Sequence, residues 1–275
     1  MNQFQNKTAL ITGASRGLGV NISLTLAEHG CNIIAVSRNE EGLQSTCKKI
    51  TSKGVSATYY PIDLSSTKSV REGIEKILSE NQSIDFLINN AGIENYQKFH
   101  HYEPNTIDDI LATNLRAPME IARLLLPNML NRGGHIVNIA SLAGKKGISY
   151  NSIYSASKAG LIMWSDALRQ ELSNTKVGVS VICPGYISDS GMFADAGIDA
   201  PKLLGTSPPQ KVANAVVKSI IGNVPEIIVN NGPIKPLLSI GQLSPKLSDK
   251  IVKFFGVPAL NLARVKLENT DKAGR

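Results

Sequence analysis

The sequence predicts an α/β fold, a doubly wound parallel sheet with helices on both faces. Short runs rich in β-branched residues alternate with longer amphipathic stretches through most of the 275 residues. Several runs, such as ALIT, NIIAV and HIVNIA, are continuously apolar, as expected of strands covered on both faces. Strand–helix alternation of this kind requires right-handed crossovers and therefore a parallel sheet.

The elements follow from these patterns in chain order. Strands are expected at residues 7–12, 32–37, 55–60, 84–89, 135–140, 177–183 and 226–229. Helices are expected at residues 17–29, 39–52, 66–80, 104–130, 152–173 and 209–221. No repeat, linker or composition break precedes about residue 230, so we expect one domain over 1–230 and a basic, partly amphipathic extension over 231–275.

Composition excludes several classes of protein. Hydrophobic residues make up 42% and charged residues 19% of the chain, which is typical of a soluble globular protein. No apolar run reaches the roughly 18 residues of a membrane-spanning helix, and the first residues enter a strand without a secretory signal. Only three widely spaced cysteines occur, and adjacent His100 and His101 point in different directions, so we expect no disulfide, no metal and a cytoplasmic location.

The net charge of +7 lies entirely at the C-terminal end. Residues 1–200 hold 18 basic and 18 acidic residues, whereas residues 201–275 hold 11 basic and 4 acidic ones. A nucleic-acid binder can concentrate charge in this way. These lysines are dispersed between apolar stretches without a nucleic-acid motif, so a solvated basic face is favoured and no nucleic acid is expected.

The stretch TALITGASRGLG joins the first strand to the first helix. Its glycines, Gly13, Gly17 and Gly19, let the backbone turn tightly and approach a phosphate that meets the helix N-terminus. A tight turn with no ligand would use the same residues. The position at the first strand–helix junction favours dinucleotide binding.

The end of the second strand predicts which dinucleotide binds. An NAD-dependent enzyme usually has Asp or Glu there, whereas this sequence has Ser37 and Arg38, with Arg16 in the glycine turn. Two guanidiniums and a hydroxyl can hold a 2′-phosphate by charge-assisted hydrogen bonds. The alternative is that both arginines are ordinary surface residues. We expect NADP(H) to be preferred over NAD(H).

Tyr154 and Lys158 form an i, i+4 pair on the predicted helix in YSASK. A free phenol has a pKa near 10, and a nearby ammonium lowers it toward the range that general acid–base catalysis needs. A tyrosine stacked on a lysine stem would have the same spacing. Ser141 favours the catalytic interpretation because it follows the strand HIVNIA, at the sheet edge where open α/β folds bind ligands.

Taken in order, TGASRGLG, Asp63 in PIDL, NNAG at 89–92, Asn114, Ser141 and YSASK closely resemble the motifs of the short-chain dehydrogenase/reductase family. The resemblance runs from about residue 7 to about 230 and extends in general to 3-oxoacyl reductase-like members. It implies a Rossmann-type sheet of strand order 3-2-1-4-5-6-7 and, usually, a homodimer or homotetramer. The cofactor-binding residues it implies, with those predicted above, are Gly13, Ser15, Arg16, Gly17, Leu18, Gly19, Ser37, Arg38, Asp63, Leu64, Asn90, Ala91, Gly92, Tyr154, Lys158, Pro184, Gly185, Ile187 and Asp189.

The resemblance also implies the catalytic roles. Tyr154 is the general acid or base at the substrate oxygen, and Lys158 lowers the pKa of the tyrosine and contacts the nicotinamide ribose. Ser141 stabilises the developing oxyanion, and Asn114 kinks its helix and holds a water that relays protons. The implied reaction interconverts a ketone or aldehyde and an alcohol, an oxidoreductase activity on CH–OH donors. A non-catalytic dinucleotide sensor on the same fold is the alternative.

One position departs from the family pattern. Asp189 stands where a threonine commonly contacts the nicotinamide carboxamide, with Ser188 and Ser190 as possible substitutes. The following residues, 191–209, are expected to form a lid, in which Met192 and Phe193 favour either an apolar ligand or packing of the lid itself. The substrate stays open between a 3-oxoacyl thioester, a steroid-like or retinoid-like ketone and a smaller carbonyl.

The extension contains one clear helix signal. Ser244 and Pro245 read as N-cap and first residue and Gly256 as the stop of KLSDKIVKFF. Leu247, Ile251, Phe254 and Phe255 are expected on one face, with the lysines off it. Such a helix can lie on an anionic membrane, which is not favoured because it is short. It can also cover the substrate mouth, dock on its own domain or a neighbouring subunit, or receive an acidic carrier protein.

Overall fold

The computed structural model describes residues 3–81, 83–189, 191–195, 200–201, 204–232 and 234–273. Its centre is a parallel sheet of seven strands in the order β3-β2-β1-β4-β5-β6-β7, which confirms the expected fold class. The strands are β1 (Thr8–Thr12), β2 (Asn32–Ser37), β3 (Ala57–Pro61), β4 (Phe86–Asn89), β5 (Gly134–Ile139), β6 (Val177–Pro184) and β7 (Glu226–Val229). The order changes direction between β1 and β4, which is the switch point where such sheets bind ligands.

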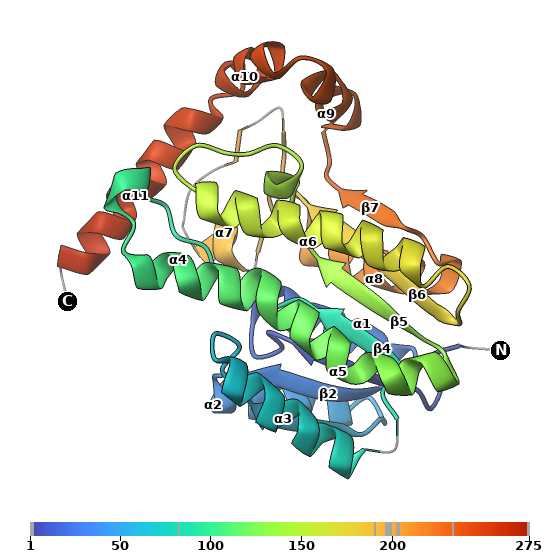
Figure 1. Ribbon diagram of the computed structural model, residues 1–275. Coiled ribbons are helices and arrows are strands. Elements are labelled where there is room, and N and C mark those ends of the chain that lie inside the picture. Colours follow the sequence, from blue (N-terminus) through green and yellow to red (C-terminus); the bar gives the residue numbers. More distant parts are fainter. Residues whose placement is uncertain are drawn as a thin grey trace.

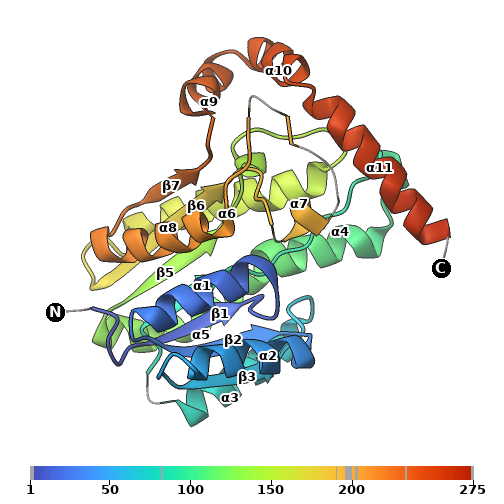
Figure 2. The same ribbon diagram turned by 180° about the vertical axis from the view of Figure 1, so that it is seen from behind.

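Helices cover both faces of the sheet, as Figures 1 and 2 show from opposite sides. One face carries α3 (Thr67–Glu80), α4 (Pro104–Leu111), α5 (Ala117–Arg132) and α6 (Ser152–Glu171). The other carries α1 (Gly17–Glu28), α2 (Glu40–Thr51) and α8 (Pro209–Gly222). The two largest apolar clusters among the described residues lie one on each side of the sheet, which is why the strands are continuously apolar.

The predicted helix over 104–130 is interrupted in its middle. Residues Ala112–Arg116 form a π-turn, η2, between α4 and α5. Pro118 follows, and because proline has no backbone N–H it cannot donate to the carbonyl four residues earlier. Asn114 lies in this π-turn, where the helical hydrogen-bond pattern changes. The kink expected at Asn114 stays a prediction.

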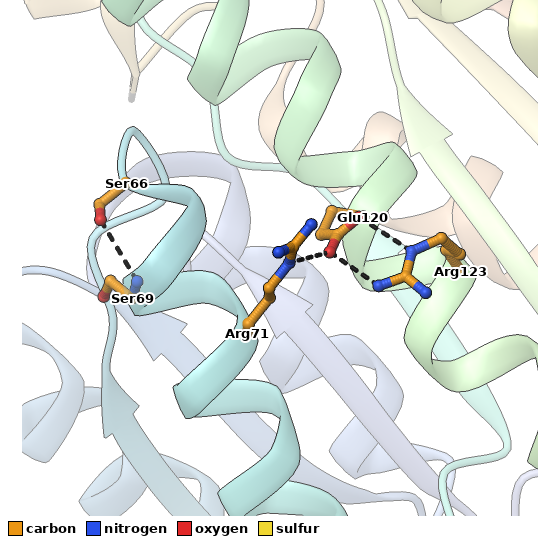
Figure 3. Close-up of polar contacts among 5 residues, drawn as sticks. All are labelled: Ser66, Ser69, Arg71, Glu120 and Arg123. Atoms are coloured by element: carbon orange, nitrogen blue, oxygen red, sulfur yellow. Dashed lines mark hydrogen bonds and ion pairs between the residues drawn. The ribbon is translucent and has the colours of Figure 1, made fainter.

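A bridge of charged side chains joins α3 to α5 (Figure 3). Glu120 accepts hydrogen bonds from Arg71 Nε at 2.6 Å and from Arg123 Nε and Nη2 at 3.0 and 2.8 Å. The two guanidiniums lower the pKa of Glu120 to about 2. Ser66 caps the start of α3 by accepting from the N–H of Ser69 at 3.2 Å. The contacts of Glu120 therefore join α3 to α5.

The extension forms three helices, α9 (Ile234–Leu243), α10 (Pro245–Phe254) and α11 (Val257–Ala273). They arch beyond the carboxyl ends of the strands and return along the side of the molecule (Figures 1 and 2). Gly256 has a φ of 72° and ends α10, and α11 begins at the next residue. The sequence predicted α10 but neither α9 nor α11.

The expected apolar face of α10 was wrong. Leu247 and Phe254 are 45% and 80% exposed, whereas Ile251 and Phe255 line an internal cavity. Ser248 is buried and Val252 also lines the cavity, so the inward face follows the spacing 248, 251, 252, 255. In the described part of the chain, no helix is both long and apolar enough to span a bilayer.

Candidate active site and dinucleotide site

The glycine turn between β1 and α1 is tightly packed. Gly13 and Gly17 have φ values of 68° and 59°, the left-handed region that glycine adopts without strain. A Cβ on Gly19 would lie 2.1 Å from the carbonyl oxygen of Gly13, so the first turn of α1 rests directly on the loop. Arg16 precedes α1 without capping it through its side chain, which leaves the helix N-terminus available for an anion.

The NNAG segment lies beside this turn. Thr12 Oγ1 accepts from the backbone N–H groups of Asn90 and Ala91 at 3.0 and 3.1 Å. The amide of Asn90 donates in return to the carbonyl of Thr12 at 2.9 Å. The ends of β1 and β4 are thereby joined at the switch point of the sheet, with Gly92 close to Lys158 Nζ.

The end of β2 carries no carboxylate. Ser37 Oγ lies 2.8 Å from Ser15 Oγ of the glycine turn, and Arg16 and Arg38 are both exposed beside it. Asn39 caps α2 by accepting from Gly42 N at 2.8 Å. The hydroxyls and guanidiniums here fit a phosphate on the adenosine ribose, because each donates and none repels an anion.

Asp63 and Leu64 follow β3. One carboxylate oxygen of Asp63 accepts from the N–H and hydroxyl of Ser65 at 3.0 and 2.9 Å. Leu64 is buried in the core and 6% exposed, so any contact of this residue with a cofactor involves its backbone.

Ser141, Tyr154 and Lys158 converge at the carboxyl end of β5. Ser141 begins the 3-10 turn η3 (Leu142–Gly144) and accepts from the N–H of Ala143 at 3.1 Å, and its hydroxyl lowers the pKa of Tyr154. Lys158 Nζ lies 5.7 Å from the Tyr154 ring centroid and donates to the carbonyl of Ile139 at 2.8 Å. A Cβ on Gly144 would lie 2.6 Å from the backbone of Lys158, so this glycine allows η3 to pack on α6 and bring the three side chains together.

Burial controls the ionisation of this group. Burial raises the pKa of Tyr154, as does Glu94, whereas the hydrogen bond with Ser141 and the Arg264 charge lower it. The sequence led us to expect a lowered value, but desolvation is the largest influence here. Burial also lowers the pKa of Lys158 to about 8. At neutral pH the tyrosine is therefore a phenol, the form that donates a proton.

Asn114 lies behind these residues and is fully buried. Its amide donates to the carbonyl of Ile93 at 2.9 Å and to Ser157 Oγ at 3.0 Å, and its oxygen accepts from the N–H of Ile93 at 2.8 Å. The side chain thus connects the loop after β4 to α6. Its predicted contact with a relay water stays a prediction.

A cavity of about 580 Å³ opens above Tyr154. Leu18, Asn90, Pro184, Gly185 and Ile187 line it together with Ser141, Tyr154 and Lys158, so it extends from the glycine turn to the tyrosine. Much of the remaining wall is apolar. This part comes from the loop after β6, from α7 (Met192–Asp195) and from the extension: Tyr186, Met192, Phe193, Leu204, Ile234, Leu237, Leu238, Ile251, Val252, Phe255 and Val257.

Asp189 differs from its neighbours. It is exposed, has a φ of 62° and accepts a hydrogen bond from Ser188 Oγ at 2.6 Å. It does not line the cavity, so a nicotinamide contact at Asp189 stays a prediction. Ser190 and residues 196–199 and 202–203 of the expected lid lie outside the described residues.

Three residues of the site were missed by sequence reasoning. Glu94, Tyr96 and Arg264 all line the cavity, and Arg264 binds both of the others. Glu94 and Tyr96 follow NNAG closely, and that position was a usable signal. Arg264 lies on α11, in a helix that the sequence did not predict.

Comparison with known proteins agrees with this geometry. A family model described as "short chain dehydrogenase" matches residues 7–200. The ketoacyl reductase HetN of Nostoc sp. is 49% identical over 280 residues, covering all of this chain and 97% of the relative.

Two solved structures share the fold. A metagenomic short-chain oxidoreductase in complex with NADP has a TM-score of 0.71 and 29% identity, covering 82% of this chain and 97% of its own. An actinorhodin polyketide ketoreductase variant with NADPH has a TM-score of 0.75 and 28% identity, covering 82% and 95%. The chain belongs to the short-chain dehydrogenase/reductase family.

Proposed function

We propose that this oxidoreductase uses NADP(H) to reduce a ketone that is carried on an apolar chain. The observation that supports this most directly is the cavity, which joins Ser141, Tyr154 and Lys158 to a mainly apolar wall. A ligand that fills it buries apolar surface on α7, α9 and α10 while its carbonyl reaches the tyrosine. The relatives named as ketoacyl and polyketide ketoreductases are consistent with this substrate class.

The dinucleotide supplies a hydride when it is bound. The uncapped N-terminus of α1 and the turn at Gly13 and Gly17 fit its pyrophosphate. Ser37 and Arg38 fit a 2′-phosphate, and the absence of a carboxylate among the described residues that end β2 supports NADP(H) over NAD(H).

The protein's own groups handle the proton and the substrate oxygen. Tyr154, held as a phenol by burial, donates its proton to the carbonyl oxygen. Ser141, whose hydroxyl lowers the pKa of Tyr154, donates to the same oxygen as negative charge develops. Lys158, whose pKa is lowered by burial to about 8, stabilises the tyrosinate that remains.

Tyr154→Phe tests this mechanism. It removes the hydroxyl and leaves the ring, so we expect NADPH consumption with 3-oxoacyl thioesters or other chain-bearing ketones to fall by roughly 10³-fold or more. NADPH binding, followed by the fluorescence of the reduced nicotinamide, should persist. Turnover equal to that of the wild type would overturn the assignment of Tyr154.

A dinucleotide sensor is the second candidate on this fold. It predicts that the wild type binds NADPH but consumes none across a panel of ketones and alcohols with either NADP(H) or NAD(H). We also propose a dimer or tetramer, which light scattering after gel filtration measures. The three cysteines are free and buried, which supports a reducing location such as the cytoplasm.

A further inference from the structure

The guanidinium of Arg264 joins three separate segments of the pocket wall. It donates to Glu94 Oε1 at 2.6 Å and to the Tyr96 hydroxyl at 2.8 Å, both in the loop after β4. It also donates to the carbonyl of Met192 in α7 at 3.3 Å. The arginine itself comes from α11, so one side chain connects the extension, the loop and the helix that covers the cavity.

This ion pair is withdrawn from solvent. The side chains of Arg264 and Glu94 are 7% and 12% exposed. The guanidinium lies 4.0 Å from the centroid of the Tyr96 ring, and Asn151 Nδ2 donates to the second oxygen of Glu94 at 3.2 Å. Because both charges are buried, removing either one leaves the other uncompensated.

The inward face of α11 is built around this contact. Val257, Asn261, Arg264 and Val265 are all buried and recur at helical spacing. Asn261 donates to the carbonyl of Ser149 at 3.1 Å, in the loop that leads to α6. Lys146 in the same loop pairs with Asp249 of α10 at 2.7 Å. The extension is therefore also joined through α10 and α11 to the loop between η3 and α6.

The pair also acts electrostatically on the catalytic tyrosine. The Glu94 carboxylate raises the pKa of Tyr154 and the Arg264 guanidinium lowers it. The other groups around the phenol are Ser141 after β5, Tyr96 in the loop after β4, Lys158 on α6 and Tyr186 after β6. Of these groups, only Lys158 can carry a charge near neutral pH. Glu94 and Arg264 therefore shift the pKa of the Tyr154 hydroxyl in opposite directions.

We propose that Arg264 is a positioning residue of the active site, which holds Glu94 as an ion pair beside Tyr154 and locks the extension and α7 into the substrate wall. The extension is thus part of the catalytic apparatus. The electrostatic part of this inference rests on the proposed function, because it is read through the proton transfer by Tyr154.

The test uses the full chain in the direction of alcohol oxidation, where Tyr154 must be deprotonated. In Arg264→Met, Glu94 acts unopposed, so the rising limb of kcat/KM against pH should move to higher pH by roughly half a unit or more. In Glu94→Gln the arginine acts unopposed and the limb should move to lower pH. The double variant should lie between them, and Arg264→Lys should stay near the wild type.

Shifts of the pH profile in opposite directions would distinguish this electrostatic role from a merely structural one. A structural role would lower kcat/KM in both Arg264→Met and Glu94→Gln without shifting the two profiles to different pH values. Lys250→Met, which removes an exposed charge from α10, is the matched control and should leave the profile unchanged. Limbs that stay in place, or that move in the same direction, would overturn the electrostatic role.

A second measurement does not depend on activity. Hydrogen exchange should be several-fold faster in peptides covering residues 93–97 and 191–194 of Arg264→Met than in the wild type or Lys250→Met. If the wild type turns over no substrate, the proposed function fails. The hydrogen-exchange rates alone then decide whether Arg264 holds the loop after β4 and α7 in the cavity wall. Equal exchange in all three proteins would overturn that role.

Discussion

The side-chain amide of Asn114 donates a hydrogen bond to Ser157 Oγ at 3.0 Å. Ser157 precedes Lys158 in α6, and its own hydroxyl donates to the carbonyl of Tyr154 at 2.7 Å. The hydroxyl of Ser157 therefore connects the π-turn that interrupts the α4–α5 helix to the segment of α6 that carries Tyr154 and Lys158. The same asparagine binds both backbone groups of Ile93, so it fixes the loop that carries Glu94 as well.

Asn114→Ala should weaken both the fold and the activity. It leaves the N–H and carbonyl of Ile93 and the hydroxyl of Ser157 without their partner, which should lower the free energy of unfolding by about 2–4 kcal/mol. Turnover should fall roughly 10–100-fold because α6 and the loop lose their common anchor. Urea unfolding and NADPH consumption measure the two effects. Ser157→Ala removes only one of these hydrogen bonds and should lower the free energy of unfolding by less. An Asn114→Ala variant that unfolds at the same urea concentration as the wild type would contradict this account.

Arg38→Asp should reverse the preference between dinucleotides. The substitution replaces a donor to the 2′-phosphate with a repelling carboxylate that can accept from a ribose hydroxyl. We expect kcat/KM for NADPH to fall roughly 10–100-fold while that for NADH holds or rises, measured with one ketone. Arg132→Asp, an exposed change at the end of α5, is the control for net charge. If the ratio of kcat/KM for NADPH to that for NADH is the same in Arg38→Asp as in the wild type, Arg38 does not bind the 2′-phosphate.

Val252→Trp should discriminate between substrates by chain length. Val252 lines the cavity from α10, so an indole there fills space that a long chain would occupy. We expect kcat/KM to fall at least 10-fold for long-chain ketones and to change little for short ones. Leu247→Trp, on the exposed side of the same helix, should affect neither. An equal loss for all chain lengths would show that the chain does not reach α10.

His135 should make the fold sensitive to acid. It is buried next to Ser180, and burial lowers its pKa to about 4. The unfolded chain takes up a proton near pH 6.5 and the folded one does not, so the free energy of unfolding should decrease by about 3 kcal/mol between pH 6.5 and pH 4. Urea unfolding across this range should show a shallower pH dependence in His135→Gln. Exposed His100→Gln should follow the wild type, and parallel curves for all three would refute the assignment.

The sheet could be predicted because each strand carries its own local signal. The strands at Asn32–Ser37 and Glu226–Val229 begin and end where the apolar runs do. Ser141, Tyr154 and Lys158 also lie close together. Ser141 closely follows β5, and Tyr154 and Lys158 are one helical turn apart on α6.

Other features depend on contacts that no local pattern encodes. The interruption at η2 arises from Pro118 together with the bonds of Asn114 to Ile93. The helices α9 and α11 carry Pro236 and Pro258 near their beginnings, where proline is tolerated but also resembles a loop signal. The raised pKa of Tyr154 follows mainly from its burial in the folded chain, which the YSASK motif alone does not reveal.

The 170 positions between Glu94 and Arg264 also impose an order on synthesis. All seven strands and the glycine turn leave the ribosome before α11 does. A nascent chain can therefore complete its dinucleotide site before α11 is available to close the cavity wall. Cofactor binding at that stage would stabilise the core first, and the contacts of Arg264 with Glu94, Tyr96 and Met192 would be among the last to form.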